Sequence, residues 1–362
     1  MNVSSSAKAV TLRSLDDLRT AALLAPGPDP ELDEVAARYA VAITPAMADL
    51  IDRHDDEDPI ARQFVPSAAE LTTLPEEMPD PIGDAAHSPV EGIVHRYPDR
   101  VLLKLVSVCA VYCRFCFRRE MVGPGHGGGL SPAALDAALA YISARPEIWE
   151  VVVTGGDPFM LSPRRLVELM AQLSRIAHVK IVRFHTRVPM VLPERIDSEF
   201  IEALKSSGKM VYVAIHANHP REFTDAARAA CAGMVDAGIP LLGQTVLLRG
   251  VNDDAATLAQ LMRAFVEWRI KPYYLHHGDL APGTAHFRTT IAAGRALMRA
   301  LQGSVSGLCQ PHYVLDIPGG HGKAPIGPGY LSAGETPPRV QDYQGAWHDY
   351  ADGSEREAKQ TP

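Results

Sequence analysis

Three cysteines lie within eight residues of the sequence and could together bind a metal group. Cys109, Cys113 and Cys116 follow a C-x3-C-x2-C pattern. Each iron of a [4Fe–4S] cluster takes an external ligand, usually a Cys thiolate, so three thiolates hold three irons and leave the fourth open. An open coordination position distinguishes a catalytic metal site from a structural one. The pattern therefore predicts a catalytic [4Fe–4S] cluster.

Zinc binding is the alternative for these cysteines. A zinc site needs a fourth Cys or His at finger-like spacing, and the sequence has no second C-x2-C pair. The three cysteines are also too close in sequence for ordinary disulfide bridges. The two remaining cysteines, Cys231 and Cys309, are predicted to be small buried apolar residues.

Two glycine-containing segments offer further chemistry. In GGDP (155–158), adjacent glycines allow the backbone to approach a ligand closely and expose its NH groups, although a plain turn is the alternative. In PGGHGKAP (318–325), Lys323 could form a Schiff base with an aldehyde cofactor. An exposed loop lysine is the alternative there. A Walker phosphate loop is excluded, because neither Ser nor Thr nor a helix start follows the lysine.

The elements that must position these residues are predicted to form an α/β fold. Six apolar, β-rich runs each precede a segment of helix length, which is typical of repeated right-handed βαβ units. Six units predict a partial (β/α)6 barrel, with reactive residues at the carboxyl ends of its strands. The GGDP segment, residues 185–187 and residues 216–220 follow predicted strands. The predicted helices span 131–144, 162–175, 194–206, 221–237, 253–268 and 291–302.

We expect three regions along the chain. Residues 1–90 read as an N-terminal helical region, with helices at 14–24, 30–39 and 45–53, and a wrapping linker at 67–90 that is rich in proline and acid. Residues 91–310 form the barrel core, and residues 311–362 form a short C-terminal extension with the Lys323 loop and a tail. The tail is polar after about residue 337, and we expect disorder past Ala351.

Composition narrows the function classes. The chain has 362 residues, 46% of them hydrophobic, and a net charge of −8. A phosphate-binding surface needs clustered Lys and Arg, so we expect no nucleic-acid partner. No apolar run reaches the roughly 18 residues of a membrane span, and the N-terminus lacks the apolar stretch of a secretory signal. A cytoplasmic protein without membrane contacts is expected.

The segment CAVYCRFCFRRE, which contains the three cysteines, resembles the radical S-adenosylmethionine superfamily. Further motifs resemble the lysine 2,3-aminomutase family in the same order: HRYPDR, GGDP, HANHP, QTVLLRGVND, YYLHHGDL, HFRT and DIPGGHGKAPIGP. The resemblance covers residues 90–345. It implies an isomerase that uses a [4Fe–4S] cluster, S-adenosylmethionine (SAM) and pyridoxal 5′-phosphate. The implied reaction moves the 2-amino group of L-lysine to C3, through a 5′-deoxyadenosyl radical, to give β-lysine.

The resemblance also implies roles for single residues. It makes Cys109, Cys113 and Cys116 the cluster ligands and Lys323 the Schiff-base lysine. The positions that surround pyridoxal phosphate are Arg96, Tyr97 and Arg100, and those that meet SAM are Gly155, Gly156, Asp157, His216 and Gln244. The substrate carboxylate is matched to Arg118, and the distal ammonium of lysine to Asp279 and Asp316. One departure is His321, where better-known members carry glycine.

Several alternatives stay open at this stage. Another amino acid, such as arginine, ornithine or glutamate, could be the substrate, although glutamate-type relatives lack the acidic pair. A non-catalytic iron–sulfur or zinc-binding protein is the second alternative. Arg114 and Arg119 are weaker candidates for binding the substrate carboxylate. The resemblance further implies an electron donor such as flavodoxin or ferredoxin, and it leaves a homo-oligomer open.

Overall fold

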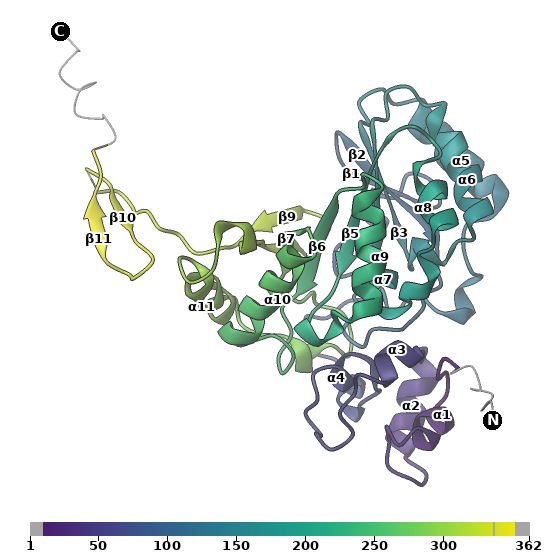
Figure 1. The fold of residues 1–362 in the computed structure, drawn as a ribbon, viewed down its shortest axis with the longest axis horizontal. Coiled ribbons are helices and arrows are strands. Elements are labelled where there is room, and N and C mark those ends of the chain that lie inside the picture. Colours follow the sequence, from purple (N-terminus) through teal and green to yellow (C-terminus); the bar gives the residue numbers. More distant parts are fainter. Residues whose placement is uncertain (1–9, 336, 352–362) are drawn as a thin grey trace, which may run out of the picture.

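The computed structural model describes residues 10–335 and 337–351. Its central feature is a nine-stranded sheet in which the strands follow one another in chain order (Figure 1). Seven strands are parallel: β2 (Arg100–Val106), β3 (Glu150–Gly155), β4 (Ile181–Thr186), β5 (Met210–His216), β6 (Leu241–Val246), β7 (Ile270–His276) and β8 (His312–Ile317). The antiparallel strands β1 (Ile93–Tyr97) and β9 (Gly322–Pro325) complete the two edges.

A helix follows each of the first six parallel strands, which confirms the predicted partial (β/α)6 barrel. These helices are α5 (Pro132–Ser143), α6 (Pro163–Ser174), α8 (Ser198–Lys205), α9 (Asp225–Asp236), α10 (Ala255–Glu267) and α11 (Ile291–Leu301). A short helix, α7 (Val188–Val191), precedes α8. Each of the six lies inside its predicted range. Strand β8 is not one of the six predicted βα units, since its ends are exposed and its apolar run is short.

Helix α6 illustrates why these segments fold as they do. The Ser162 side chain accepts a hydrogen bond from the Arg165 NH, which caps the helix, and Pro163 occupies the first turn. Leu166, Leu169, Met170 and Leu173 are buried at a spacing of three and four residues. This apolar stripe faces the sheet, so burial of one helix face stabilises each βα unit.

Four short helices precede the barrel: α1 (Leu15–Thr20), α2 (Pro30–Arg38), α3 (Pro45–Ala48) and α4 (Ala61–Phe64). They lie together beside the barrel, below it in Figure 1. Helix α3 ends well before the predicted residue 53. The Asp52 and Asp58 side chains accept backbone NH groups of the following turn, from His54 and Ile60. Such local bonds compete with helix propagation.

Residues 67–90 contain only two 3-10 turns, η1 (Ala68–Leu71) and η2 (Ala85–His87), yet two of their acidic side chains, Glu70 and Asp84, are deeply buried. Glu70 accepts hydrogen bonds from Arg114 Nε at 2.9 Å and from Arg119. All three side chains are buried. Arg114 and Arg119 therefore neutralise Glu70 and do not face the cavity as substrate-binding groups.

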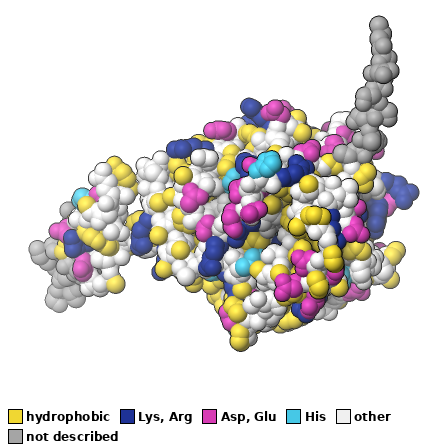
Figure 2. Space-filling view, turned by 90° about the horizontal axis from the view of Figure 1, so that it is seen from below, with side chains coloured by type: hydrophobic (Ala, Val, Ile, Leu, Met, Phe, Trp, Pro, Cys, Tyr) yellow, Lys and Arg dark blue, Asp and Glu magenta, His cyan; other side chains and the backbone are white. Residues whose placement is uncertain are grey.

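The chain ends in a small hairpin, β10 (Arg339–Gln341) and β11 (Trp347–Asp349), which lies apart from the barrel (Figure 1). The prediction of disorder past Ala351 falls outside the described residues. Within them, no helix has the length and apolar character needed to cross a membrane. On the face shown in Figure 2, side chains of both charge signs are interspersed.

Loss of the Glu70 carboxylate should destabilise the protein strongly. In Glu70→Gln, two buried guanidinium groups would lack their carboxylate, and breaking a buried ion pair costs about 3–5 kcal/mol. Urea denaturation should reveal a loss of that size. Glu76→Gln is the matched control, because Glu76 is half exposed and lies 3.6 Å from Arg288. An equal effect of both substitutions would contradict the role given to Glu70.

Candidate active site

A single cavity of about 740 Å³ opens at the carboxyl edge of the parallel strands. Apart from the weaker candidates Arg114 and Arg119, all the site residues proposed from the sequence line it, although they come from elements spread over more than 200 positions of the chain. Parallel strands end at one edge of a sheet, so side chains that follow different strands meet there. The cysteines and Lys323 therefore face one common space.

The three cysteines lie on the loop after β2. Their side chains are free thiols, and each is partly exposed to the cavity. Burial raises the pKa of Cys109, and it raises the pKa of Cys116 to about 11. These thiols ionise readily only when iron takes the place of the proton. No group of three or more His, Cys, Asp and Glu side chains in the described ranges is arranged to hold one metal ion. A cubane cluster does not need such an arrangement, because each thiolate binds a different iron.

The GGDP turn after β3 differs from the prediction in one respect. The Gly156 NH donates to the Val106 carbonyl at 2.5 Å, and the Asp157 NH donates to the Val108 carbonyl at 2.9 Å. These NH groups hold the start of the cysteine loop and do not point to a ligand. A Cβ on Gly156 would lie 2.4 Å from the Val108 oxygen, which explains the glycine. The ammonium group of a ligand can only donate hydrogen bonds, so at this turn only backbone carbonyl oxygens could accept them.

The Asp157 carboxylate is also fully used within the protein. It accepts hydrogen bonds from the Thr186 hydroxyl and from the Arg187 NH, both at 2.7 Å. Burial raises its pKa, although these donors oppose the shift. Asp157 thus ties the end of β3 to the end of β4, and its effect on a bound ligand is indirect.

His216 and Gln244 lie side by side at the ends of β5 and β6, where they are register partners. The His216 Nε2 atom lies 3.0 Å from the Asn218 side-chain oxygen. Burial lowers the pKa of His216 well below its usual value, so the ring is neutral. Its centroid is 5.6 Å from that of Phe115 on the cysteine loop. Both side chains can therefore contact a ligand that extends away from the cysteines.

Lys323 lies on β9, directly opposite Asp316 on β8. Its amino group donates to the Asp316 carboxylate and lies 3.4 Å from His276 Nδ1. The Tyr97 hydroxyl accepts a hydrogen bond from the Lys323 NH at 2.7 Å. Gly322 has a φ of +89°, and a Cβ there would approach the Tyr97 hydroxyl to 2.9 Å. The loop before Lys323 is thus held by the tyrosine.

The departure at His321 leaves this loop geometry intact. His321 is exposed, and its φ is not positive, whereas the glycines on both sides of it have positive φ values. A side chain is therefore tolerated at position 321 without backbone strain.

Two arginines of the site, Arg96 and Arg118, are held by one buried carboxylate. Asp84 accepts from Arg96 at 3.2 Å and from Arg118 at 3.0 Å, and its side chain is 1% exposed. Burial works against ionisation, but the charge of Arg118 outweighs it and keeps the pKa of Asp84 below its usual value. Arg100 instead pairs with Asp99 at 2.7 Å and lies over the Tyr97 ring. Each guanidinium keeps further NH groups for a ligand.

Asp279 lines the cavity and carries no ion pair in the described part of the chain. Burial and the nearby charge of Asp316 raise its pKa to about 7. Asp316 behaves in the opposite way. Burial opposes its ionisation, but His276 and Lys323 hold its pKa below the usual range. The two acids thus lie close enough to influence each other, and one of them lacks a cation.

Two residues at the end of β4, His185 within the strand and Arg187 directly after it, have no role predicted from the sequence. His185 lines the cavity, and its Nε2 atom is buried without a hydrogen-bond partner in the described residues. Burial lowers its pKa well below the usual value. Arg187 donates to Cys113 Sγ at 3.0 Å. The segment FHTR at the end of a predicted strand was the only signal for either residue.

The residues present fit the three groups that the sequence implies. Three thiols share one wall, as a cluster requires. In the same cavity, the nitrogen atoms His185 Nε2 and Arg118 Nε are buried without a partner among the described residues. Buried polar atoms need partners, and a bound phosphate, carboxylate or heterocycle would supply them. The cavity volume also lies in the range of cofactor sites.

Comparisons with known proteins agree with this site. The Radical SAM superfamily matches residues 103–262, and such a domain uses a [4Fe–4S] cluster and SAM. The L-lysine 2,3-aminomutase of Clostridium subterminale is 41% identical over 80% of this chain and 70% of the relative. That of Acetoanaerobium sticklandii is 38% identical over 88% and 77%. The glutamate 2,3-aminomutase of Clostridioides difficile is 38% identical over 83% and 70%. The chain belongs to the lysine 2,3-aminomutase family of radical SAM isomerases.

Proposed function

We propose that this protein is a pyridoxal phosphate-dependent radical SAM aminomutase that moves the 2-amino group of L-lysine to C3. The observation that carries the proposal is the meeting of three cysteines, Lys323 and an acidic pair around one cavity. When bound, the cluster supplies one electron to SAM, and pyridoxal phosphate supplies the electron-withdrawing ring that an amino shift needs. The protein's own residues orient these groups and exclude water.

Charge balance at the Lys323 end favours a cationic substrate. Asp279 and Asp316 face a single ammonium group, that of Lys323. Until the substrate amine displaces it from an aldehyde cofactor, Lys323 would not offer an ammonium group to Asp316. Two carboxylates then face the cavity, and the ε-ammonium of a substrate lysine would neutralise them. A glutamate side chain would instead add a third negative charge.

Arg118 is the proposed partner of the substrate carboxylate. Its NH2 nitrogen is fixed by Asp84, and its NH1 nitrogen lies 3.4 Å from the Thr154 hydroxyl. This leaves the rest of its planar, always charged fork for a carboxylate. Because Asp84 also holds Arg96, a proposed phosphate ligand, the two anionic groups would be bound at a fixed separation.

The setting of the reaction forms part of the same proposal. Five free cysteines and an oxidisable cluster suit a reducing, cytoplasmic compartment. A low-potential electron donor such as flavodoxin or ferredoxin would reduce the cluster. We also propose the division into residues 1–90, 91–310 and 311–362, with the barrel core in the middle region.

Removal of any one proposed cluster ligand should abolish SAM cleavage. Cys109→Ala, Cys113→Ala and Cys116→Ala should each lose iron-linked colour after anaerobic reconstitution, because a cubane that lacks a thiolate is not held. Cys231→Ala is the matched control, since Cys231 is buried in α9, away from the cavity. A Cys113→Ala protein with full iron content and activity would disprove the site.

Borohydride should trap pyridoxal phosphate on Lys323. The reagent reduces a Schiff base to a stable amine, and peptide mass spectrometry then locates the label. Lys271 is a suitable internal control, because its amino group bonds to the carbonyls of Leu308 and Gln310 at the surface. A label on Lys271 or Lys104 would show that the cofactor binds elsewhere.

The acidic pair should set substrate specificity. Loss of one partner of a buried charge pair costs about 2–5 kcal/mol, so Asp279→Asn and Asp316→Asn should bind lysine roughly 30- to several-thousand-fold more weakly. The double variant should lose less than the sum, because both acids face one charge. Cluster content should stay normal. If both variants turned over lysine at the wild-type rate, another amino acid would be the substrate.

The pH dependence of lysine binding should report on Asp279. Its pKa of about 7 means that the free protein carries a proton there at lower pH, and binding of an ammonium requires the ionised form. The KM for lysine should therefore rise by up to tenfold per pH unit below pH 7. Asp279→Asn should lose this dependence, while Asp99→Asn, which changes an exposed acid, should keep it.

A further inference from the structure

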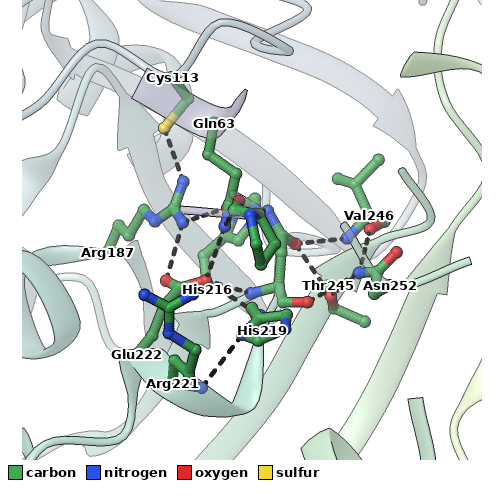
Figure 3. A network of polar contacts seen from close by, with 12 residues as sticks. Gln63, Cys113, Arg187, His216, His219, Arg221, Glu222, Thr245, Val246 and Asn252 are labelled. Atoms are coloured by element: carbon green, nitrogen blue, oxygen red, sulfur yellow. Dashed lines mark hydrogen bonds and ion pairs between the residues drawn. The ribbon is translucent and has the colours of Figure 1, made fainter. Parts of the chain in front are cut away.

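Among the described residues, Arg187 is the one cation whose side chain donates a hydrogen bond to the sulfur of a proposed cluster ligand. It follows β4 directly, and only 5% of the residue is exposed. Its NH1 nitrogen donates to Cys113 Sγ at 3.0 Å. Its NH2 nitrogen donates to Gln63 Oε1 at 2.6 Å and to Glu222 Oε2 at 2.8 Å (Figure 3). The guanidinium therefore lies between the cysteine loop and a buried polar network.

The network fixes the direction in which Arg187 points. Glu222 Oε1 accepts from the NH groups of Asn218 at 2.9 Å and His219 at 3.0 Å, so this carboxylate cannot follow the arginine if it moves. Gln63 belongs to α4 and also bonds to Asn218. The guanidinium carbon lies 4.6 Å from the centre of the Phe64 ring. Held from these sides, NH1 can point only toward the sulfur.

Pairing with Glu222 alone does not account for this geometry. A guanidinium commonly binds a carboxylate with two parallel NH groups. Here Glu222 accepts a hydrogen bond only from NH2 of Arg187. The other terminal nitrogen, NH1, donates to a thiol, which is a weak acceptor. The contact becomes strong only when the sulfur is a thiolate, as in a metal-bound cysteine.

We propose that Arg187 is a positioning residue that donates a charge-assisted hydrogen bond to the Cys113 thiolate of the bound cluster and thereby favours the reduced cluster. The inference rests on the proposed function, in which Cys113 binds iron. Reduction adds one electron from an external low-potential donor and breaks no bond, so the cluster becomes more negative by one charge. Hydrogen bonds to cluster sulfurs and nearby positive charge stabilise that state and raise the reduction potential.

The test is the reduction potential of the reconstituted cluster, measured without substrate by dithionite titration with redox mediators and electron paramagnetic resonance. Arg187→Lys keeps the positive charge but loses the two terminal nitrogens of the guanidinium, which donate to Cys113 and to Glu222. The double variant Arg187→Met, Glu222→Gln removes the donor without leaving Glu222 unpaired. At a fixed ambient potential, the double variant should contain at least tenfold less reduced cluster, which corresponds to about 59 mV. Arg187→Lys should show a smaller shift in the same direction.

Arg221→Lys is the matched control. Arg221 lies in the same region of the structure (Figure 3), but it pairs with Asp58 at 2.5 Å and contacts no cysteine. The cluster of the Arg221→Lys variant should keep the wild-type reduction potential. Iron content and thermal unfolding of each variant are measured on the same samples, so that lost folding is separated from a shifted potential.

Two outcomes would overturn the inference. One is an unchanged potential in both Arg187 variants with full iron content. The other is failure of Arg187→Lys to hold any cluster while its fold is intact, since the arginine would then be needed for assembly and not for reduction. Neither outcome affects the proposed function, which instead fails if Cys113→Ala retains a complete cluster.

Discussion

Four arginines on the cysteine loop and on β1 can be buried only because two carboxylates from residues 67–90 neutralise them. Asp84 binds Arg96 and Arg118, and Glu70 binds Arg114 and Arg119. An unpaired buried charge costs several kcal/mol, so each arginine takes the position that its carboxylate dictates. The cysteine loop carries three of these four arginines and is therefore oriented by a segment that has almost no regular structure.

The same segment also contacts the other end of the site. A Cβ on Gly83 would lie 2.3 Å from the Gly320 nitrogen, so the two backbones are in direct contact. His87 Nε2 lies 2.9 Å from the Gly320 carbonyl oxygen. Residues 83–87 thus lie between the arginines and the Lys323 loop. A shift of this segment would move Arg118 and Lys323 together, which keeps the groups proposed to bind substrate and cofactor in register.

The sequence predicted the barrel well because its signal is local. Each βα unit combines a buried apolar run with an amphipathic helix, and both patterns are visible within about 30 residues. Strands β1 and β9 pair antiparallel at the sheet edges and are short, so their pattern is weak. The candidate ligands were found through motifs at strand ends, where a parallel fold brings them together.

The supporting residues could not be predicted in the same way. Glu70 and Arg114 are 44 positions apart, and Gln63 and Arg187 are 124 apart. No periodicity links such pairs, and an acidic, proline-rich stretch looks like a solvated linker until its partners are known. The GGDP turn was misjudged for a related reason. Its NH groups could be assigned to a ligand only while the neighbouring carbonyls of Val106 and Val108 were unknown.

These long-range contacts place a cation beside the cysteines and two acids beside Lys323. At the cysteine end, Asp157 fixes the backbone of Arg187, whose guanidinium points to Cys113. At the other end, Asp279 and Asp316 face a single lysine. In the proposals made here, the cation would stabilise a cluster that gains an electron, and the acids would stabilise a substrate ammonium. Because these groups are largely buried, water screens their charges only weakly, and each acts strongly on a ligand bound beside it.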